Sequence, residues 1–195
     1  MSHFNHFNII GPIYDLIFGR RIDQEIVNFA EMEAGQYLLD VGGGTGRVSI
    51  LFKDITQNVL IADSALNMVQ EAQAKGLRPI LSHSENLPFV DQSFDRIIMV
   101  DALHHVADQK RTLEEMWRLL SPNGKMIIEE PDIANFVVKL IALGEKILLM
   151  RSHFLEPSAI IKMGQFDQKA QVEIHRESGN AWIIISKNKQ DDKEE

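Results

Sequence analysis

Short, continuous apolar runs recur along the chain, separated by segments in which apolar residues repeat at helical spacing. The runs are apolar throughout and do not alternate with polar residues, which is typical of parallel strands covered on both faces. The alternation therefore predicts an α/β protein with a mostly parallel sheet. The predicted parallel strands are residues 37–41, 58–63, 79–84, 94–101 and 125–130.

Helical spacing is found in four segments, three of which have a recognisable start or stop signal. The first segment ends before Gly35, and the third lies between a serine that can act as an N-cap and Gly76. The motif SPNG at 121–124 predicts a turn before the fifth strand. The predicted helices are residues 20–34, about 48–55, from the capping Ser64 to about Lys75, and from the capping Asp108 to about Leu120.

The C-terminal part of the chain breaks the alternation of strand and helix. Two further apolar segments, 169–177 and 181–187, are joined by only three residues, a link too short for a crossover. This predicts a hairpin, and hence an antiparallel edge on the parallel sheet. We expect one domain over residues 1–188 and a disordered, charged tail at 189–195.

Composition and charge exclude several classes of function. The chain has 195 residues, a net charge of −8 and no cysteine, which argues against nucleic-acid binding and excludes disulfides and thiolate metal sites. The N-terminus lacks the pattern of a secretory signal, and no apolar run reaches the length of a membrane span. His3 and His6 lie without other clustered ligands, so no metal site is predicted. We expect a soluble, cytoplasmic protein, and the sequence makes no prediction of its oligomeric state.

The segment QYLLDVGGGTGRVSI, residues 36–50, joins the first strand to a helical pattern through a glycine-rich turn. Such a turn brings backbone N–H groups and a helix N-terminus close to a ligand. The spacing does not fit a Walker-type phosphate loop, and Arg47 stands where a dinucleotide fingerprint needs its third glycine. The pattern present is D-x-G-x-G-x-G, formed by Asp40, Gly42, Gly44 and Gly46.

This pattern resembles the first motif of class I S-adenosylmethionine-dependent methyltransferases. The stretches at 84–106 and 113–131 resemble later motifs of that family, and Asp63 stands where the family has its ribose-binding acid. The resemblance covers about residues 36–131 and is close to the subgroup that includes ubiquinone and menaquinone biosynthesis C-methyltransferases. It implies a Rossmann-like, doubly wound sheet of seven strands, with S-adenosyl-L-methionine as cofactor.

The resemblance assigns several residues to the methionine and ribose half of the cofactor. Gly42, Gly44 and Gly46 should line this half, and Asp40 should orient the loop and the amino group of the cofactor. Asp63 should bind the ribose hydroxyls; taken alone, it could equally cap a helix.

The adenine half is assigned to residues after the second and third strands. By resemblance, Ser64 and Met68 lie near the adenine ring, although Met68 could equally pack in the core. The family often has an acid at the position of His83, and a neutral imidazole can also accept a hydrogen bond. Ser84 or Glu85 could bind the adenine amino group instead.

The candidate catalytic residues follow the fourth strand. His104 and His105 lie at the end of the sheet where such folds bind ligands, and a histidine has a pKa suited to a general base. The alternative is a structural or gating role for the pair. Val100 can offer its backbone carbonyl to the cofactor, and Asp101 is a further candidate neighbour.

Two segments are expected to complete the site. Residues 1–19 should cover the cofactor, with Tyr14 touching it or merely packing, and residues 132–157 should form a helical insertion on the acceptor side. The insertion is strongly apolar, which suits a lipophilic acceptor such as a quinol precursor, contact with a membrane surface, or simple packing on the sheet. The alternatives are N-methylation of a phospholipid or small amine, and cofactor binding without transfer.

Overall fold

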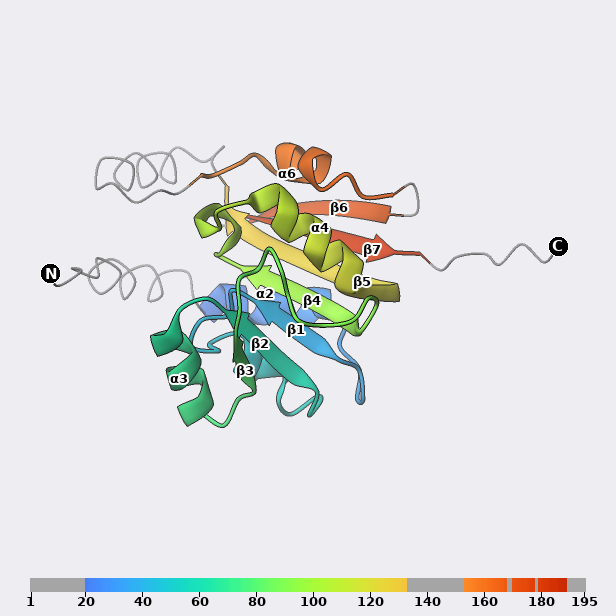
Figure 1. The fold of residues 1–195 in the computed structure, drawn as a ribbon. Helices are drawn as coiled ribbons and strands as arrows, with labels where there is room; N and C mark the ends of the chain where they lie inside the picture. Colours follow the sequence, from blue (N-terminus) through green and yellow to red (C-terminus); the bar gives the residue numbers. More distant parts are fainter. Residues whose placement is uncertain (1–19, 133–152, 168–169, 178, 189–195) are drawn as a thin grey trace, which may run out of the picture.

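The seven strands form one sheet in the order β3-β2-β1-β4-β5-β7-β6 (Figure 1). The structure, a computed structural model, describes residues 20–132, 153–167, 170–177 and 179–188. Within these ranges the sheet agrees with the predicted Rossmann-like α/β architecture. The strands are β1 Leu38–Val41, β2 Val59–Asp63, β3 Pro79–Leu81, β4 Phe94–Val100, β5 Leu120–Pro131, β6 Ala170–Glu177 and β7 Asn180–Lys187.

The first five strands are parallel, and the last two form the predicted antiparallel hairpin. β7 pairs with β5 along Lys125–Pro131 and with β6 along its full length. From β1 the chain runs outward to β2 and β3, and then returns to β4 on the other side of β1. This reversal opens a crevice at the carboxyl ends of β1 and β4, where folds of this type bind ligands.

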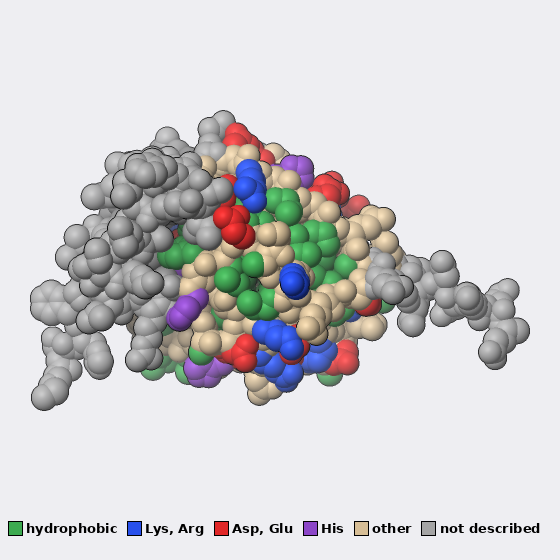
Figure 2. Space-filling model, turned by 90° about the horizontal axis from the view of Figure 1, so that it is seen from above, with side chains coloured by type: hydrophobic (Ala, Val, Ile, Leu, Met, Phe, Trp, Pro, Cys, Tyr) green, Lys and Arg blue, Asp and Glu red, His purple; other side chains and the backbone are tan. Residues whose placement is uncertain are grey.

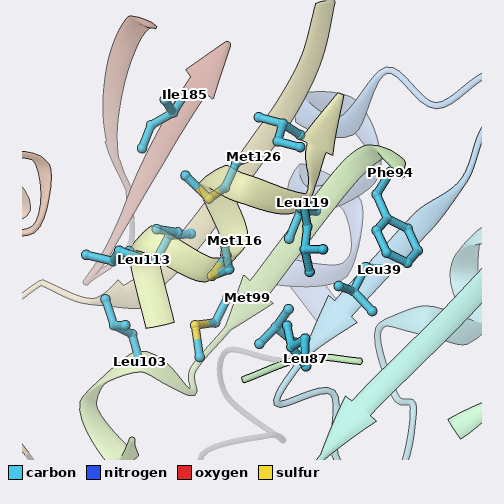
Figure 3. Close-up of a cluster of buried hydrophobic side chains, with 14 of the residues drawn as sticks. Leu39, Leu87, Phe94, Met99, Leu103, Leu113, Met116, Leu119, Met126 and Ile185 are labelled. Atoms are coloured by element: carbon cyan, nitrogen blue, oxygen red, sulfur yellow. The ribbon is translucent and has the colours of Figure 1, made fainter. Parts of the chain in front are cut away.

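Helices cover both faces of the sheet. One face packs against α4 and α6, and its core includes Met99, Met116 and Met126 together with Leu39 and Ile185 (Figure 3). The other face packs against α2 and η2 around side chains such as those of Leu38, Phe52 and Trp182. The described helices are α2 Arg20–Ala30, η2 Ser49–Phe52, α3 Leu66–Ala74, η3 Leu103–His105, α4 Gln109–Leu119 and α6 Pro157–Gly164.

The β6 strand forms one edge of the sheet and is exposed on both faces. Val172 and Ile174 are among its exposed apolar side chains, and Glu173 and His175 alternate with them. Seen from above, the side on which α6 and β6 lie in Figure 1, the surface shows apolar side chains between separate acidic and basic ones (Figure 2). Charged side chains along an edge strand oppose pairing with a further strand.

The first helix ends earlier than predicted. α2 ends at Ala30, not at residue 34, because the buried guanidinium of Arg96 donates to the carbonyl oxygens of Ala30 and Glu31. Glu31 then takes a left-handed backbone conformation, with φ +44°, which turns the chain away from the helix. Gly35 lies in the turn that follows.

The other differences between the predicted and the observed elements concern short segments. After the glycines the chain forms only the 3₁₀ turn η2 instead of a helix over 48–55. β3 ends at Leu81, so the predicted strand at 79–84 is three residues too long. The predicted turn at 121–124 lies inside β5 as a bulge, because Phe94 pairs with Leu120 whereas Arg96 pairs with Lys125.

Candidate functional site

A cavity of about 590 Å³ lies at the carboxyl ends of β1, β2 and β4, within the size range of small-molecule sites. Asp101, Ala102, Val106 and Ala107 line one end of it, and Ala62, Ala65 and Asn67 line the other parts. Most of the predicted site residues of the described chain also line it. These are Gly42, Gly44, Asp63, Ser64, Met68, His83, Ser84, Glu85 and His105.

The first two glycines of the motif open the cavity. A Cβ on Gly42 would lie 2.8 Å from the Cβ of Ala102, so only glycine lets the loop pass this close to the end of β4. Gly44 has φ +54° and faces open space, and its N–H donates to Asp63 Oδ2 at 2.9 Å. The backbone is therefore exposed where a ligand can approach it.

Gly46 has a different place from the one predicted. It is not among the residues that line the cavity, and a Cβ there would lie 2.1 Å from Leu77 Cδ1 and 2.9 Å from Ile61 Cδ1. With φ +77°, Gly46 serves close packing of the loop on the sheet.

Asp40 supports the glycine loop from behind and does not line the cavity. Its side chain is 1% exposed, and Ser49 Oγ donates to Asp40 Oδ2 at 2.7 Å. A Cβ on Gly43 would come within 2.6 Å of the same carboxylate, so the loop lies directly on it. Burial, partly offset by the Ser49 hydrogen bond, raises the pKa of Asp40 to about 6.

Asp63 holds together the two segments that border the cavity. Oδ2 accepts from Gly44 N–H, and Oδ1 accepts from Ala65 N–H at 2.8 Å, just before α3 begins. The prediction that Ser64 caps this helix is wrong: Ala65 occupies the N-cap position and no side chain caps the helix. The Asp63 carboxylate accepts the hydrogen bond from the N–H group next to the helix start. Ser64 is left exposed at the cavity wall.

The residues predicted for the adenine half gather at one wall of the cavity. Met68 belongs to none of the buried clusters, so its place on the cavity wall argues against simple core packing. Ser84 Oγ lies 3.0 Å from Thr112 Oγ1, and Glu85 Oε1 accepts from Asp108 N–H at 3.2 Å. The wall is thus tied to the start of α4.

The two adjacent histidines have different surroundings. His104 is buried, does not line the cavity, and its Nδ1 lies 2.6 Å from Glu130 Oε2. Its ring stacks on Phe154 with a centroid distance of 4.2 Å. This geometry fits the structural alternative for His104.

His105 lines the cavity and is exposed there. Loss of hydration where the ring is partly enclosed by the protein, together with the charge of His104, lowers the pKa of His105 to about 4. His105 is therefore neutral near pH 7 and is a weak base, and of the two adjacent histidines it is the one that lines the cavity.

Other predicted residues lie at the border of the site or outside the described residues. Val100 packs partly against the α2 side of the core, and its side chain does not line the cavity. Tyr14, the segment 1–19 and most of the segment 132–157 lie outside the described residues. Ala102, Val106 and Ala107 follow the fourth strand and were not assigned from the sequence, since small apolar residues carry no chemical signal of their own.

The described part of the chain contains no group of three histidine or acidic side chains that could hold a metal ion. Among the same residues, no helix is long and apolar enough to cross a membrane.

Comparison with known proteins was made for sequence and for structure. Residues 39–128 match the family described as "Methyltransferase domain". The demethylmenaquinone methyltransferase of Paenarthrobacter aurescens is 31% identical over 135 residues, which are 64% of this chain and 53% of that protein. The ubiquinone/menaquinone biosynthesis C-methyltransferase of Haemophilus ducreyi is 30% identical over 144 residues, 65% of this chain and 56% of that protein. The chain thus spans a little over half the length of these relatives.

A solved structure from Thermotoga maritima, described as a possible histamine N-methyltransferase, superposes with a TM-score of 0.75. It is 20% identical, and the match covers 95% of this chain and 98% of that one, which supports the fold alone.

The strand order, the glycine loop and the match of residues 39–128 to the methyltransferase domain family all agree with the resemblance to class I S-adenosylmethionine-dependent methyltransferases. S-adenosyl-L-methionine is the cofactor of that class. Within the class, the chain resembles the demethylmenaquinone and ubiquinone/menaquinone biosynthesis methyltransferases.

Proposed function

We propose that the protein transfers a methyl group from S-adenosylmethionine to a small, lipophilic acceptor of the quinol type. The observation that carries the cofactor assignment is Asp63, which lies at the cavity wall and is bonded to the glycine loop. The curated relatives named for quinone biosynthesis support the acceptor class. The apolar side chains of Ala102, Val106 and Ala107 at the far end of the cavity agree with a lipophilic acceptor.

In this proposal the chain acts chiefly by positioning. When bound, the cofactor supplies an electrophilic methyl group on a neutral leaving group. The open backbone at Gly42 and Gly44 and the carboxylate of Asp63 would hold the cofactor, while the walls near Ala102 and His105 align the acceptor atom in line with the methyl group. A neutral His105 could accept a hydrogen bond from a quinol hydroxyl, but its lowered pKa makes it a poor proton acceptor at pH 7.

Calorimetric titration with S-adenosylhomocysteine, alongside NADH, tests the cofactor assignment. We expect S-adenosylhomocysteine to bind and NADH not to bind, because Arg47 replaces the third glycine of a dinucleotide loop. Asp63→Ala should weaken S-adenosylhomocysteine binding by about 30-fold or more, since two ribose hydroxyls lose a charged acceptor.

Asp54→Ala removes an exposed aspartate away from the cavity and should leave the affinity unchanged. Circular dichroism and a cooperative thermal transition establish that each variant is folded. Equal affinity in Asp63→Ala and wild type would contradict the assignment.

The acceptor class is tested by transfer of the labelled methyl group to a panel of demethylated quinols, phospholipids and small amines. Transfer to a quinol carbon alone supports the proposal. Transfer only to an amine, or none to any acceptor by a protein that binds the cofactor, would favour the N-methyltransferase or the non-catalytic alternative.

A further inference from the structure

The loop between β3 and β4, residues 82–93, forms part of the cavity wall and rests on α4. Its first residues, Ser82 to Glu85, line the cavity, and Leu87 is buried among side chains of α4. The loop contains neither helix nor strand. The position of this wall therefore depends on what the rest of the loop contacts.

A row of three polar side chains on α4, Thr112, Glu115 and Arg118, faces this loop. They follow one another at steps of three residues, a spacing that places neighbours on the same side of a helix. Thr112 and Glu115 are buried although both are polar. Buried polar side chains are normally hydrogen-bonded, because an unmatched polar group is costly to bury. The partners of this polar row include residues of the loop.

Glu115 and Arg118 bind each other and the backbone of the loop. Arg118 Nη2 and Nε donate to Glu115 Oε1 and Oε2 at 2.7 and 2.9 Å, which makes a bidentate pair. Glu115 Oε1 also accepts from Leu87 N–H at 2.8 Å. Arg118 Nη1 donates to the carbonyl oxygen of Phe89 at 3.0 Å. The hydrogen bond from Arg118 lowers the pKa of Glu115, so the pair stays ionised at neutral pH.

The polar row also reaches the cavity wall itself. Thr112 Oγ1 lies 3.0 Å from Ser84 Oγ, and Ser84 lines the cavity. The loop is thus bound to α4 at Ser84 and again at Leu87, on both sides of Glu85. A hydrogen bond weakens steeply when its length or angle changes, so the contacts with α4 decide whether acceptors on this wall are fixed in place for a ligand.

We propose that Thr112, Glu115 and Arg118 are positioning residues, which hold Ser84 and Glu85 where these can accept a hydrogen bond from the amino group of adenine. Without the polar row the wall would still be present, but its acceptors would no longer be fixed. The site would then distinguish adenine less well from a base that lacks the amino group. This inference rests on the proposed cofactor and adds the residues that set the selectivity for its base.

The test measures the selectivity for the base by calorimetry, with S-adenosylhomocysteine and S-inosylhomocysteine as probes. The second probe carries an oxygen in place of the adenine amino group and cannot donate a hydrogen bond from that position. Wild type should bind S-adenosylhomocysteine more tightly by about tenfold or more. Arg118→Lys keeps the charge but loses the planar guanidinium, and should reduce this preference by about threefold or more.

Thr112→Val removes the hydroxyl group that meets Ser84, should also reduce the preference, and decides the question if Arg118→Lys does not fold. Arg111→Lys, at an exposed position on the same helix, is the matched control and should leave the preference unchanged.

A lower thermal transition with an unchanged preference would show that the polar row only stabilises the fold, and this overturns the inference while the proposed function stands. A wild type without any preference between the probes has the same consequence. Failure of folded wild-type protein to bind either probe overturns both.

Discussion

Residues of the same type in the same motif have different structural roles in this protein. Gly44 faces open space and presents its backbone to the cavity, whereas Gly46 is pressed against Leu77 and Ile61. The adjacent His104 and His105 differ in the same way, since one is bonded to Glu130 and the other lines the cavity. A sequence motif therefore indicates which positions are important, but the role of each residue follows only from its contacts in the structure.

The two glycines should therefore respond differently to alanine. Gly46→Ala should destabilise the fold by about 2–4 kcal/mol, because a methyl group would overlap Leu77 and the left-handed conformation adds strain. Gly44→Ala should cost only about 1–2 kcal/mol from its backbone conformation, but should weaken cofactor binding. Urea unfolding separates the two, and equal losses of stability would contradict the packing role of Gly46.

At the scale of the element, the end of α2 shows how a distant side chain sets a helix boundary. Arg96 lies 66 residues from Ala30 in sequence, yet its guanidinium binds the last carbonyls of the helix and also donates to Asp95 O at 2.9 Å. Helical spacing alone continues to residue 34, and Gly35 offers a plausible stop. The sequence could not reveal the earlier end, because the sheet that carries Arg96 determines it.

Arg96→Lys should lower the free energy of unfolding by about 1–2 kcal/mol, because an ammonium group cannot reach the three carbonyls that the planar guanidinium binds together. Denaturant unfolding measures the change. Arg78→Lys, at an exposed position, is the matched control and should have little effect. A loss of stability no greater than that of the control would show that Arg96 does not hold the end of α2.

At the scale of the whole molecule, the sequence predicted the parallel sheet and the C-terminal hairpin correctly, because strand burial and the short link leave direct patterns. It also indicated most residues of the cavity wall, because glycine spacing and acids at strand ends are local signals. The burial of Glu129 and the separation of His104 from the cavity were not predictable, since both result from β4 and β5 lying side by side.

The dependence of stability on pH should reflect two groups whose pKa values are shifted in opposite directions, Asp40 upward and His105 downward. Asp40 has a pKa of about 6 in the folded protein, above its ordinary value, so its contribution is present below pH about 4 and is lost as the pH rises through 6. His105 has a folded pKa of about 4, below its ordinary value, so its contribution is present above pH about 6.5 and is lost as the pH falls through 4.

As the pH is lowered from about 6.5 to 4.5, wild type should therefore gain stability relative to Asp40→Asn and lose stability relative to His105→Gln. Thermal unfolding across this range checks both signs. A difference that is constant with pH for either variant would refute the shift assigned to that group.

The position of β7 between β5 and β6 has a consequence for the synthesis of the protein. The ribosome releases the five parallel strands before Asn180–Lys187 exists, so the nascent chain carries β5 with an open, apolar edge. An unpaired edge of this kind invites association with other chains until it is covered. Formation of the C-terminal hairpin therefore ends the interval in which the growing polypeptide exposes this edge of β5.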